Sequence, residues 1–488
     1  MNRRELEEAV RPTASSVDGR RFTFQCSLQG LELQPGGYVS IGEGLLGQVH
    51  ALGHAWAEGA ELASATTRER SQVADGRAAL ARGDGLVLDP EAGPFHELVF
   101  EPASASTVSS WLEAARTSGA RLDVGQLMIE PGVRFSLAAD GFNRHTFLCG
   151  QSGSGKTFAL GVLLEQVLLQ TSIRVVILDP NSDFVRLGAV RDGVDQALAG
   201  RYREATKALT VLSQEASAGD RLHVRFRDCD AEEQAAILRL DPIRDREEYG
   251  ALLDMLESGL EATSASTAEL GERLRGMERE DVRMLGIRLR NLGIDRWPIW
   301  SLGDEGSVQD LVGPGGPRAL VVDLGSLATP GEKAIAAETV LAALWRNRSR
   351  REPVLVVIDE AHNVCPREPG DEVTALATES AGRIAAEGRK FGLYLLVSTQ
   401  RPQRVTELVV SQCDNLLLMR MTSTSDLAYV SDVLSYAPKP LLDRATSFRI
   451  GESLVAGKAA SHPALVRFGP RISEEGGADV PATWASGA

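Results

Sequence analysis

The chain contains 488 residues, of which 43% are hydrophobic and 24% are charged, so it is long enough for two or three domains and has an ordinary globular composition. It has no run of about 18 apolar residues, and its first residues lack the apolar core of a signal peptide, which argues against membrane spanning and secretion. The net charge of −15 argues against broad nonspecific adhesion to nucleic acid or anionic lipid, although a ring can be acidic outside and basic in its bore.

Residues 1–121 contain short β-type runs bounded by glycine and proline. The runs are FTFQCSLQG (22–30), GYVSIGEG (37–44), LLGQVHAL (45–52), LVLDP (86–90) and FHELVFEP (95–102). Repeated short strands at this spacing predict a small β-barrel or sandwich. His50 and His54 are four residues apart but have no third ligand nearby, which favours ordinary surface histidines over a metal pair.

Residues 122–227 follow a strand–turn–helix–strand order that predicts a βαβ unit. TFLC (146–149) precedes a glycine-rich loop, a helical run extends to Gln170, and RVVILDP (174–180) is the next strand. Similar apolar strands return after an interruption, in the segments ALVVDLGSL (319–327), PVLVVIDE (353–360), GLYLLVSTQ (392–400) and NLLLMRM (415–421). Near-continuous apolar strands predict an α/β domain whose mostly parallel sheet is covered on both faces.

The interruption, residues 228–300, alternates leucine with charge at helical spacing, which predicts a helical-bundle insertion. Between Asp228 and Arg290 there are sixteen acidic and nine basic residues, a balance of −7, so we expect an outer surface here. Residues 301–470 are then the second part of the α/β domain, with a hairpin at 450–468, and 471–488 are an extended tail.

The five cysteines are scattered and show no CxxC spacing. They are Cys26, Cys149, Cys229, Cys365 and Cys413. This pattern argues against a disulfide framework and a zinc site, and it favours buried thiols in a reducing compartment. We therefore expect a cytoplasmic protein.

The loop GQSGSGKT matches the pattern G-x-x-x-x-G-K-[ST], in which glycines let successive backbone N–H groups point at phosphate oxygens at a helix N-terminus. Lys156 is expected to reach the β and γ phosphates of ATP, and the Thr157 hydroxyl to hold Mg²⁺. The predicted nucleotide-binding residues here are Gly150, Gln151, Ser152, Gly153, Ser154, Gly155, Lys156, Thr157 and Phe158. A chance match is disfavoured because the chain has only six lysines and the loop separates a strand from a helix.

PVLVVIDEAH supplies the acidic half of such a site. Asp359 closes an apolar strand, where it can ligate Mg²⁺ through water, and Glu360 can polarise a water against the γ-phosphate. An adjacent Asp-Glu pair favours hydrolysis over phosphoryl transfer, whereas the alternative is a pair of helix N-cap acids. Gln400, at the end of a neighbouring strand, is expected to sense the γ-phosphate or orient water, unless it only forms a turn.

The segment RIAAEGRKFG places cations on an exposed corner. In a monomer these are solvated charges, but in a ring one arginine can enter the neighbour's site and neutralise charge in the transition state. We predict that Arg389 does this, with Arg383 as the next choice.

These segments, in this order, resemble the HerA/FtsK group of P-loop ATPases, and most closely the HerA-type DNA translocases. The matching stretches are RHTFLCGQSGSGKT (144–157), LDPNSDF (178–184), VVIDEAH (356–362), EGRKFGLYLLVSTQRP (387–402) and GESLVAGKAASHP (451–463). The resemblance implies a RecA-like core and makes residues 1–121 an N-terminal barrel for ring assembly and partner docking. It also implies that Arg144 approaches the nucleotide within its own subunit. The family's Asp-Pro-His-Gly-Glu turn is here Asp179-Pro-Asn-Ser-Asp183, so only its acids are kept.

The resemblance further implies a hexameric ring that hydrolyses ATP and moves along double-stranded DNA. Such proteins usually act with an effector encoded beside them, a nuclease or a sirtuin-like enzyme, in DNA-end processing or antiphage defence. An arginine-rich, lysine-poor composition favours a bacterial setting.

Three functions remain open from the sequence. A DNA motor predicts basic loops in the bore, for which the candidates are Arg186, Arg191, Arg401 and Arg404, each of which can equally be a solvated surface arginine. An ATP-controlled scaffold ring that regulates a partner enzyme fits the long barrel and acidic exterior. A conjugation or secretion motor is disfavoured by the lack of a membrane segment.

Overall fold

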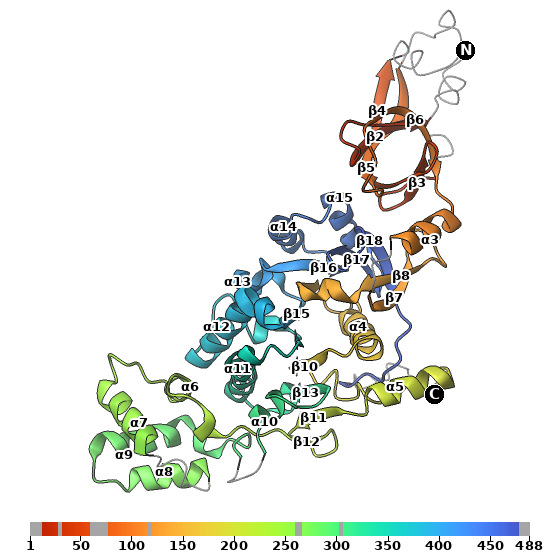
Figure 1. Ribbon diagram of the computed structural model, residues 1–488. Helices are drawn as coiled ribbons and strands as arrows, with labels where there is room; N and C mark the ends of the chain where they lie inside the picture. The colour runs from red at the N-terminus through yellow and green to blue at the C-terminus, as the bar shows by residue number, and fades with distance from the viewer. Residues whose placement is uncertain are drawn as a thin grey trace, which may run out of the picture. The chain divides into compact units, whose positions relative to one another are not determined.

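The computed structural model describes residues 12–27, 32–58, 77–115, 119–258, 266–301 and 306–477 (Figure 1). The chain divides into two compact units, and each is built from two separate parts of the sequence. The first unit contains Met1–Ala138 and Leu416–Gly469, and the second contains Ala139–Asn415 and Pro470–Ala488.

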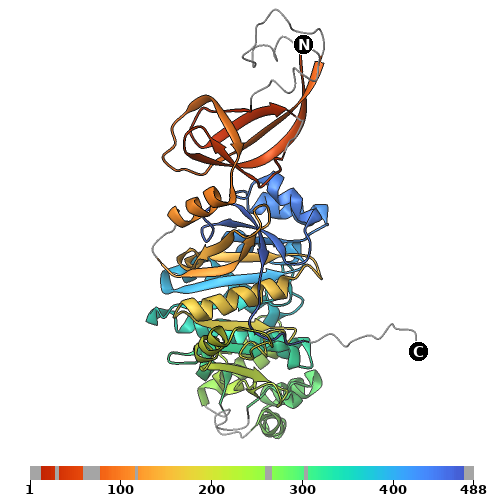
Figure 2. The same ribbon diagram turned by 90° about the vertical axis from the view of Figure 1, so that its right-hand side faces the viewer.

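The first unit begins with a closed six-stranded barrel, which confirms the predicted small barrel (Figures 1 and 2). In barrel order the strands are β1 (Thr13–Ser16), β2 (Arg21–Ser27), β5 (Arg77–Val87), β4 (Leu45–Glu58), β3 (Tyr38–Ile41) and β6 (Phe95–Pro102), and neighbours are antiparallel. Phe22, Phe24 and Phe100 fill its core. Gly85 on β5 leaves room for the ring of Phe22, because a Cβ there would lie 2.5 Å from that ring.

The rest of the first unit is a second antiparallel set of strands with short helices. The strand order is β17 (Glu452–Gly457), β18 (Ala464–Phe468), β7 (Arg121–Leu127) and β8 (Arg134–Ala138), so the hairpin expected at 450–468 is present. The helices are α3 (Ala105–Ala114), α14 (Thr424–Val433) and α15 (Lys439–Leu442). His462 is buried beside Tyr38, whose hydroxyl lies 2.7 Å from His462 Nε2, and burial lowers the pKa of His462 to about 3.

The second unit contains the predicted parallel sheet. Its strand order is β12 (Asp220–Arg221), β11 (Leu209–Ser213), β13 (Ala319–Asp323), β10 (Arg174–Asp179), β14 (Val354–Ile358), β15 (Leu393–Thr399) and β9 (His145–Cys149). The next strand in the order is β16 (Cys413–Met419), of which only residues 413–415 belong to this unit. The pairs from β12 to β9 are all parallel. In the pairing register of neighbouring strands, Ile358 of β14 lies beside Val397 of β15, and Thr399 of β15 lies beside Cys149 of β9. The segments that follow β9, β14 and β15 therefore meet at one edge of the sheet.

Helices cover both sides of these strands. In Figure 1, α4 (Lys156–Gln170) and α5 (Gln196–Ala205) lie on one side, and α11 (Pro330–Arg346) and α12 (Glu372–Glu387) on the other. The shorter helices are α10 (Val308–Val312) and α13 (Glu407–Val410). Strand residues between the two layers are almost all buried, which explains why the strands are apolar without alternation.

Four further helices lie in the segment where a helical insertion was expected. They are α6 (Ala231–Ile237), α7 (Arg246–Ser258), α8 (Thr267–Arg275) and α9 (Glu280–Leu292). Each of α7, α8 and α9 buries one leucine-rich side, including Leu252, Leu274 and Leu289. The α8 and α9 helices approach closely at Gly286, where a Cβ would lie 2.8 Å from the carbonyl oxygen of Gly271. The limits predicted for the individual domains remain predictions. Among the described helices, none is both long and apolar enough to cross a membrane.

Candidate nucleotide-binding site

The loop between β9 and α4 has the backbone that its glycines predict. Gly153 and Gly155 adopt positive φ angles of 71° and 89°, a backbone conformation that residues with a Cβ seldom adopt. Gly150 N donates to the carbonyl oxygen of Thr399 at 3.3 Å, which fixes the start of the loop to β15. The hydroxyl of Ser154 is buried and makes no hydrogen bond with any described residue. The loop thus curls tightly over the N-terminus of α4.

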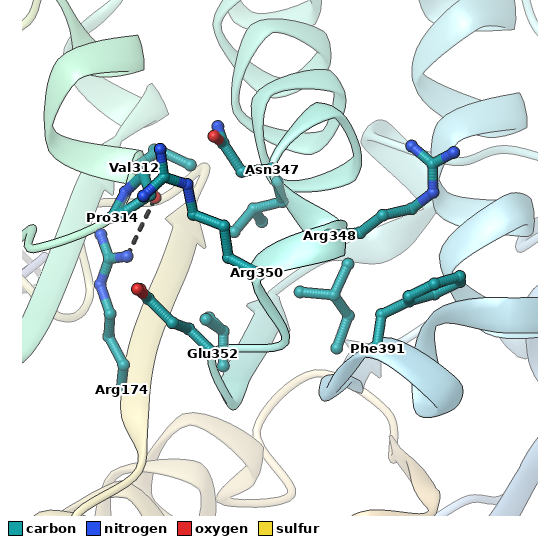
Figure 3. A pocket seen from close by; sticks show the side chains of 11 residues that line it. Arg174, Val312, Pro314, Asn347, Arg348, Arg350, Glu352 and Phe391 are labelled. Carbon is teal, nitrogen blue, oxygen red and sulfur yellow. Dashed lines mark hydrogen bonds between the residues drawn. The ribbon is translucent and has the colours of Figure 1, made fainter.

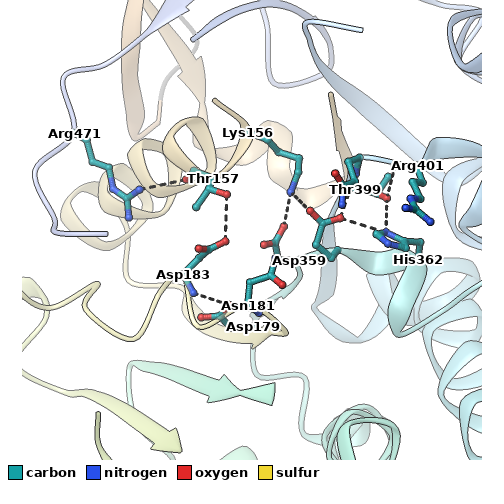
Figure 4. Close-up of polar contacts among 12 residues, drawn as sticks. Lys156, Thr157, Asp179, Asn181, Asp183, Asp359, His362, Thr399, Arg401 and Arg471 are labelled. Atoms are coloured by element: carbon teal, nitrogen blue, oxygen red, sulfur yellow. Dashed lines mark hydrogen bonds and ion pairs between the residues drawn. The ribbon is translucent and has the colours of Figure 1, made fainter. Parts of the chain in front are cut away.

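Lys156 points from the first turn of α4 to the end of β14. Its Nζ lies 3.1 Å from Asp359 Oδ1 and 2.9 Å from Glu360 Oε1, and its side chain is only 7% exposed (Figure 4). Burial alone would lower the pKa of Lys156, but the two carboxylates outweigh burial and raise it. Lys156 therefore remains an ammonium, paired with both acids that the sequence placed in this site.

Asp359 and Glu360 differ in their surroundings. Asp359 is completely buried, and its Oδ2 makes no hydrogen bond with a described residue. Glu360 has a left-handed backbone (φ 40°, ψ 51°), which costs about 1 kcal/mol or more for a residue with a side chain. Burial would raise the pKa of Glu360, yet His362 and Lys156 lower it to about 2. Glu360 is thus an ionised carboxylate held in one place.

His362 and Thr399 complete the surroundings of Glu360, and neither was a predicted site residue. His362 Nδ1 lies 3.3 Å from Glu360 Oε2 and 3.0 Å from Thr399 Oγ1. The backbone N–H of Gln400 donates to Glu360 Oε2 at 3.3 Å. The predicted Gln400 is therefore brought to the acid through its backbone. His362 stands two residues after Glu360 in VVIDEAH, but its direction could not be read from the sequence.

Asp179 and Asp183 form a second acidic group beside the loop. Asp183 Oδ2 accepts a hydrogen bond from the Thr157 hydroxyl at 3.3 Å (Figure 4). Asp179 caps the turn by accepting from the backbone N–H groups of Asn181, Asp183 and Phe184. Burial, and secondarily the charge of Asp359, raises the pKa of Asp183 to about 6, and burial raises that of Asp179 to about 7. Asp183 thus lies within hydrogen-bonding distance of Thr157, even though the turn that carries Asp183 departs from the expected motif.

This donor set fits Mg²⁺ bound together with a nucleotide. Mg²⁺ prefers oxygen ligands, and three oxygen donors are available here. They are the Thr157 hydroxyl, the Asp183 carboxylate and Asp359 Oδ2, which makes no hydrogen bond with a described residue. No group of three or more His, Cys, Asp or Glu side chains among the described residues forms a complete metal cage. Mg²⁺ usually binds through one or two protein ligands, waters and substrate phosphates, so an incomplete cage is what such a site requires.

Comparisons with known proteins agree with this geometry. Residues 122–282 match the family described as Helicase HerA, central domain. The chain is 25% identical over 385 residues to the DNA double-strand break repair helicase HerA of Pyrococcus furiosus, covering 71% of this chain and 69% of that one. The chain is thus similar to the HerA helicases, most clearly over residues 122–282. A second such helicase, from Sulfurisphaera tokodaii, is 31% identical over 156 residues, which are 30% of this chain and only 31% of that relative.

A solved structure is similar to this chain in fold. The plasmid coupling protein TrwB in complex with ADP and Mg²⁺ superimposes with a TM-score of 0.50 at 15% identity, covering 75% of this chain and 92% of that chain. At this identity the likeness concerns the fold alone. It agrees with a RecA-like α/β core.

The two arginines expected to serve the nucleotide, Arg389 and Arg144, lie close to one another. Arg389 follows α12, in the short helix Gly388–Phe391, and its Nη1 lies 3.5 Å from Asp414 Oδ2. Arg144 precedes β9, and its Nη1 lies 3.5 Å from the same oxygen. Arg144 is thus at the strand end opposite the glycine loop, about 15 Å along a five-residue strand. Its predicted approach to the nucleotide remains a prediction.

The other predicted arginines are mostly surface residues. Arg383 pairs with Glu379 on the same helix. Arg186 lies 3.1 Å from Glu474 and is 64% exposed. Arg401 and Arg404, which follow β15, are exposed and form no ion pair with another described residue.

A separate hollow lies at the amino ends of β10, β14 and β15, away from the glycine loop (Figure 3). Its volume is about 300 Å³ including open solvent, and its lining includes Arg174, Arg348 and Phe391. Arg174 donates its N–H groups to the carbonyl oxygens of four residues, Leu311, Val312, Gly313 and Pro317. The guanidinium of Arg348 lies over the Trp345 ring at 4.4 Å. Arg174 and Arg348 thus make their contacts within the fold, and the hollow contains none of the predicted nucleotide-binding residues.

Proposed function

We propose that this protein hydrolyses ATP with Mg²⁺ in a homo-hexameric ring and uses the energy to move along double-stranded DNA. The observation that carries the proposal is the position of Lys156, held between Asp359 and Glu360 at the mouth of a glycine loop. A buried lysine, an adjacent acid pair and a tightly curled glycine loop at a helix N-terminus together provide for binding and hydrolysing a triphosphate.

Each residue has a defined part in this proposal. Backbone N–H groups of the glycine loop and the Lys156 ammonium would bind the phosphates, and Thr157, with Asp359 through water, would hold Mg²⁺, which offsets phosphate charge when bound. When Lys156 turns to the phosphates, Glu360 Oε1 loses its ion pair and becomes available to accept a hydrogen bond from water. His362 and the Gln400 N–H keep the other oxygen of Glu360 fixed, so that the water is oriented rather than merely attracted.

Arg389 is the residue that we propose to act on the neighbouring subunit. Its side chain is 38% exposed, and its partner among the described residues, Asp414, is itself 40% exposed, so the pair can open at little cost. An arginine supplied from outside a site can raise kcat by about 10³–10⁵.

DNA is the proposed track because the relatives matched by the central domain are described as DNA double-strand break repair helicases. Arg401 and Arg404 are the exposed cations nearest in sequence to Gln400, and they are the proposed phosphate contacts. We further propose that the six-stranded barrel docks a partner effector, a nuclease or a sirtuin-like enzyme, in DNA-end processing or antiphage defence.

The deciding experiment is the steady-state ATPase rate of the wild type and of Glu360→Gln, with and without linear duplex DNA, alongside a light-scattering measurement of particle mass. Stimulation of the wild type by duplex DNA, a hexamer mass and an inactive Glu360→Gln variant that still binds ATP would support the motor. A rate that ignores DNA but responds to a partner protein would replace the motor with an ATP-controlled scaffold ring. Wild-type protein that binds no nucleotide would end the proposal.

A further inference from the structure

Residues 470–477, here called the strap, return to the second unit and run antiparallel to residues 183–191. Ser473 and Val190 form a β-bridge. The backbone hydrogen bonds across this contact run from Arg191 N to Ile472 O (2.9 Å), from Glu474 N to Ala189 O (2.9 Å) and from Gly476 N to Asp183 O (3.0 Å). The strap therefore extends the turn that carries Asp183 by backbone pairing.

The strap is also anchored to α4, by a carboxylate inside the fold. Glu165 is fully buried, and its carboxylate accepts hydrogen bonds from Ile472 N at 2.8 Å, from Ser473 N at 2.7 Å and from Ser473 Oγ at 2.6 Å. Arg471 Nε lies 3.6 Å from Glu165 Oε1, and both side chains are 0% exposed. An ion pair taken out of water is favourable only when further hydrogen bonds satisfy it, as these do.

Arg471 extends from this anchor to the glycine loop. Its Nη1 contacts the carbonyl oxygen of Thr157 at 3.5 Å (Figure 4), and its Nη2 donates to Glu474 O at 3.3 Å. The guanidinium lies against α4 where residue 161 is glycine. A Cβ at Gly161 would stand 2.5 Å from Arg471 Cζ, so a larger residue would push the guanidinium away. The absence of a side chain at Gly161 thus leaves the space on α4 that the Arg471 guanidinium fills.

These contacts converge on two residues of the candidate site. The strap touches the Thr157 carbonyl through Arg471 and the Asp183 carbonyl through Gly476, and the Thr157 and Asp183 side chains are hydrogen-bonded to each other. Gly476 is the residue type that this approach requires, since a Cβ there would lie 2.0 Å from the carbonyl oxygen of Ser182.

We propose that Arg471 is a positioning residue, which through the strap sets the separation of Thr157 and Asp183 and so tunes the Mg²⁺ side of the nucleotide site. The inference rests on the proposed function. Arg471 does not itself touch phosphate or metal. Removing partners that orient metal-binding groups commonly weakens metal affinity about 10- to 100-fold, and lysine cannot replace the planar fork that reaches Ser473, Thr157 and Glu474.

The test uses the full chain and a fluorescent ADP analogue, titrated in excess Mg²⁺ and in EDTA. Arg471→Met is expected to weaken binding at least tenfold in Mg²⁺ and to leave binding in EDTA within about twofold. Arg467→Met is the matched control, because it removes another Arg–Glu pair, with Glu452, outside the strap, and the Arg467 side chain is 50% exposed. It is expected to bind like the wild type in both conditions.

A second variant guards against misfolding. Arg471→Met combined with Glu165→Gln leaves no unpaired charge inside the fold, and it should retain wild-type circular dichroism while showing the same Mg²⁺-specific loss. Wild-type binding in Mg²⁺ by this double variant, or equal losses in Mg²⁺ and EDTA, would overturn the positioning role. Absence of nucleotide binding by the wild type would instead remove the proposed function on which the inference rests.

Discussion

His362 provides the sharpest test of how Glu360 is held. A carboxylate only accepts hydrogen bonds, so the Nδ1 of His362 has to carry the proton that it shares with Glu360 Oε2 at 3.3 Å. The pKa of Glu360 is about 2 rather than its ordinary 4.5 despite burial, which corresponds to about 3 kcal/mol in favour of the ionised form. A hydrogen bond to a charged group contributes about 1.5–3 kcal/mol, so His362 accounts for a large share.

We therefore expect His362→Ala to lower kcat for ATP hydrolysis by about 10- to 100-fold, because Glu360 keeps its charge but loses its fixed direction. KM should stay within about twofold, since Lys156 and the glycine loop are untouched. The assay is steady-state phosphate release at saturating Mg²⁺ and duplex DNA. His362→Asn is the matched variant, because its amide N–H can stand where Nδ1–H stands, and it should recover part of the lost rate. Wild-type kcat in His362→Ala would refute the reasoning. Equal losses in both variants would show that the packing of the imidazole, rather than its hydrogen bond to Glu360, supports the rate.

Three further outcomes are expected. Lys156→Met should weaken binding of Mg·ATP by about 100-fold or more in a fluorescence titration, since Lys156 is the cation placed beside Asp359 and Glu360 at the mouth of the loop; affinity within threefold of wild type would contradict the site. Arg389→Ala should lower kcat by about 10³-fold while leaving nucleotide affinity unchanged, whereas Arg383→Ala should stay within about threefold in the same ATPase assay. Gly85→Ala should destabilise the barrel by about 1–3 kcal/mol and lower the melting temperature, because its Cβ would lie 2.2 Å from the carbonyl oxygen of Gln48, and an unchanged melting temperature would show that the strands can separate there.

Local pattern was sufficient for the parallel sheet, the barrel and the glycine loop. Residues 146–149 and 354–358 are short, apolar and followed by polar residues, and parallel strands bring such ends to one edge whatever the rest of the chain does. That is why Lys156 and Glu360, 204 positions apart, could be assigned to one site before any contact was known.

The remaining site contacts depend on long-range packing, which carries no local signal. Arg471 contacts Thr157 across 314 positions of sequence. The need for a glycine at residue 161 follows only from the packing of the strap on α4. Asp183 sits in a turn whose glycine and histidine are missing, so its hydrogen bond to Thr157 follows from the turn geometry set by Asp179 rather than from the motif. The division into units that each combine distant segments is likewise a property of packing.

The carboxylate of Asp414 has a consequence for the proposed ring. Arg144 and Arg389 both approach the same oxygen of Asp414 at 3.5 Å, one from before β9 and the other from before β15. If Arg389 moves outward to a neighbouring subunit as proposed, Arg144 still pairs with Asp414, so the Asp414 carboxylate is not left without a positive partner. The electrostatic cost of the departure and return of Arg389 is therefore small.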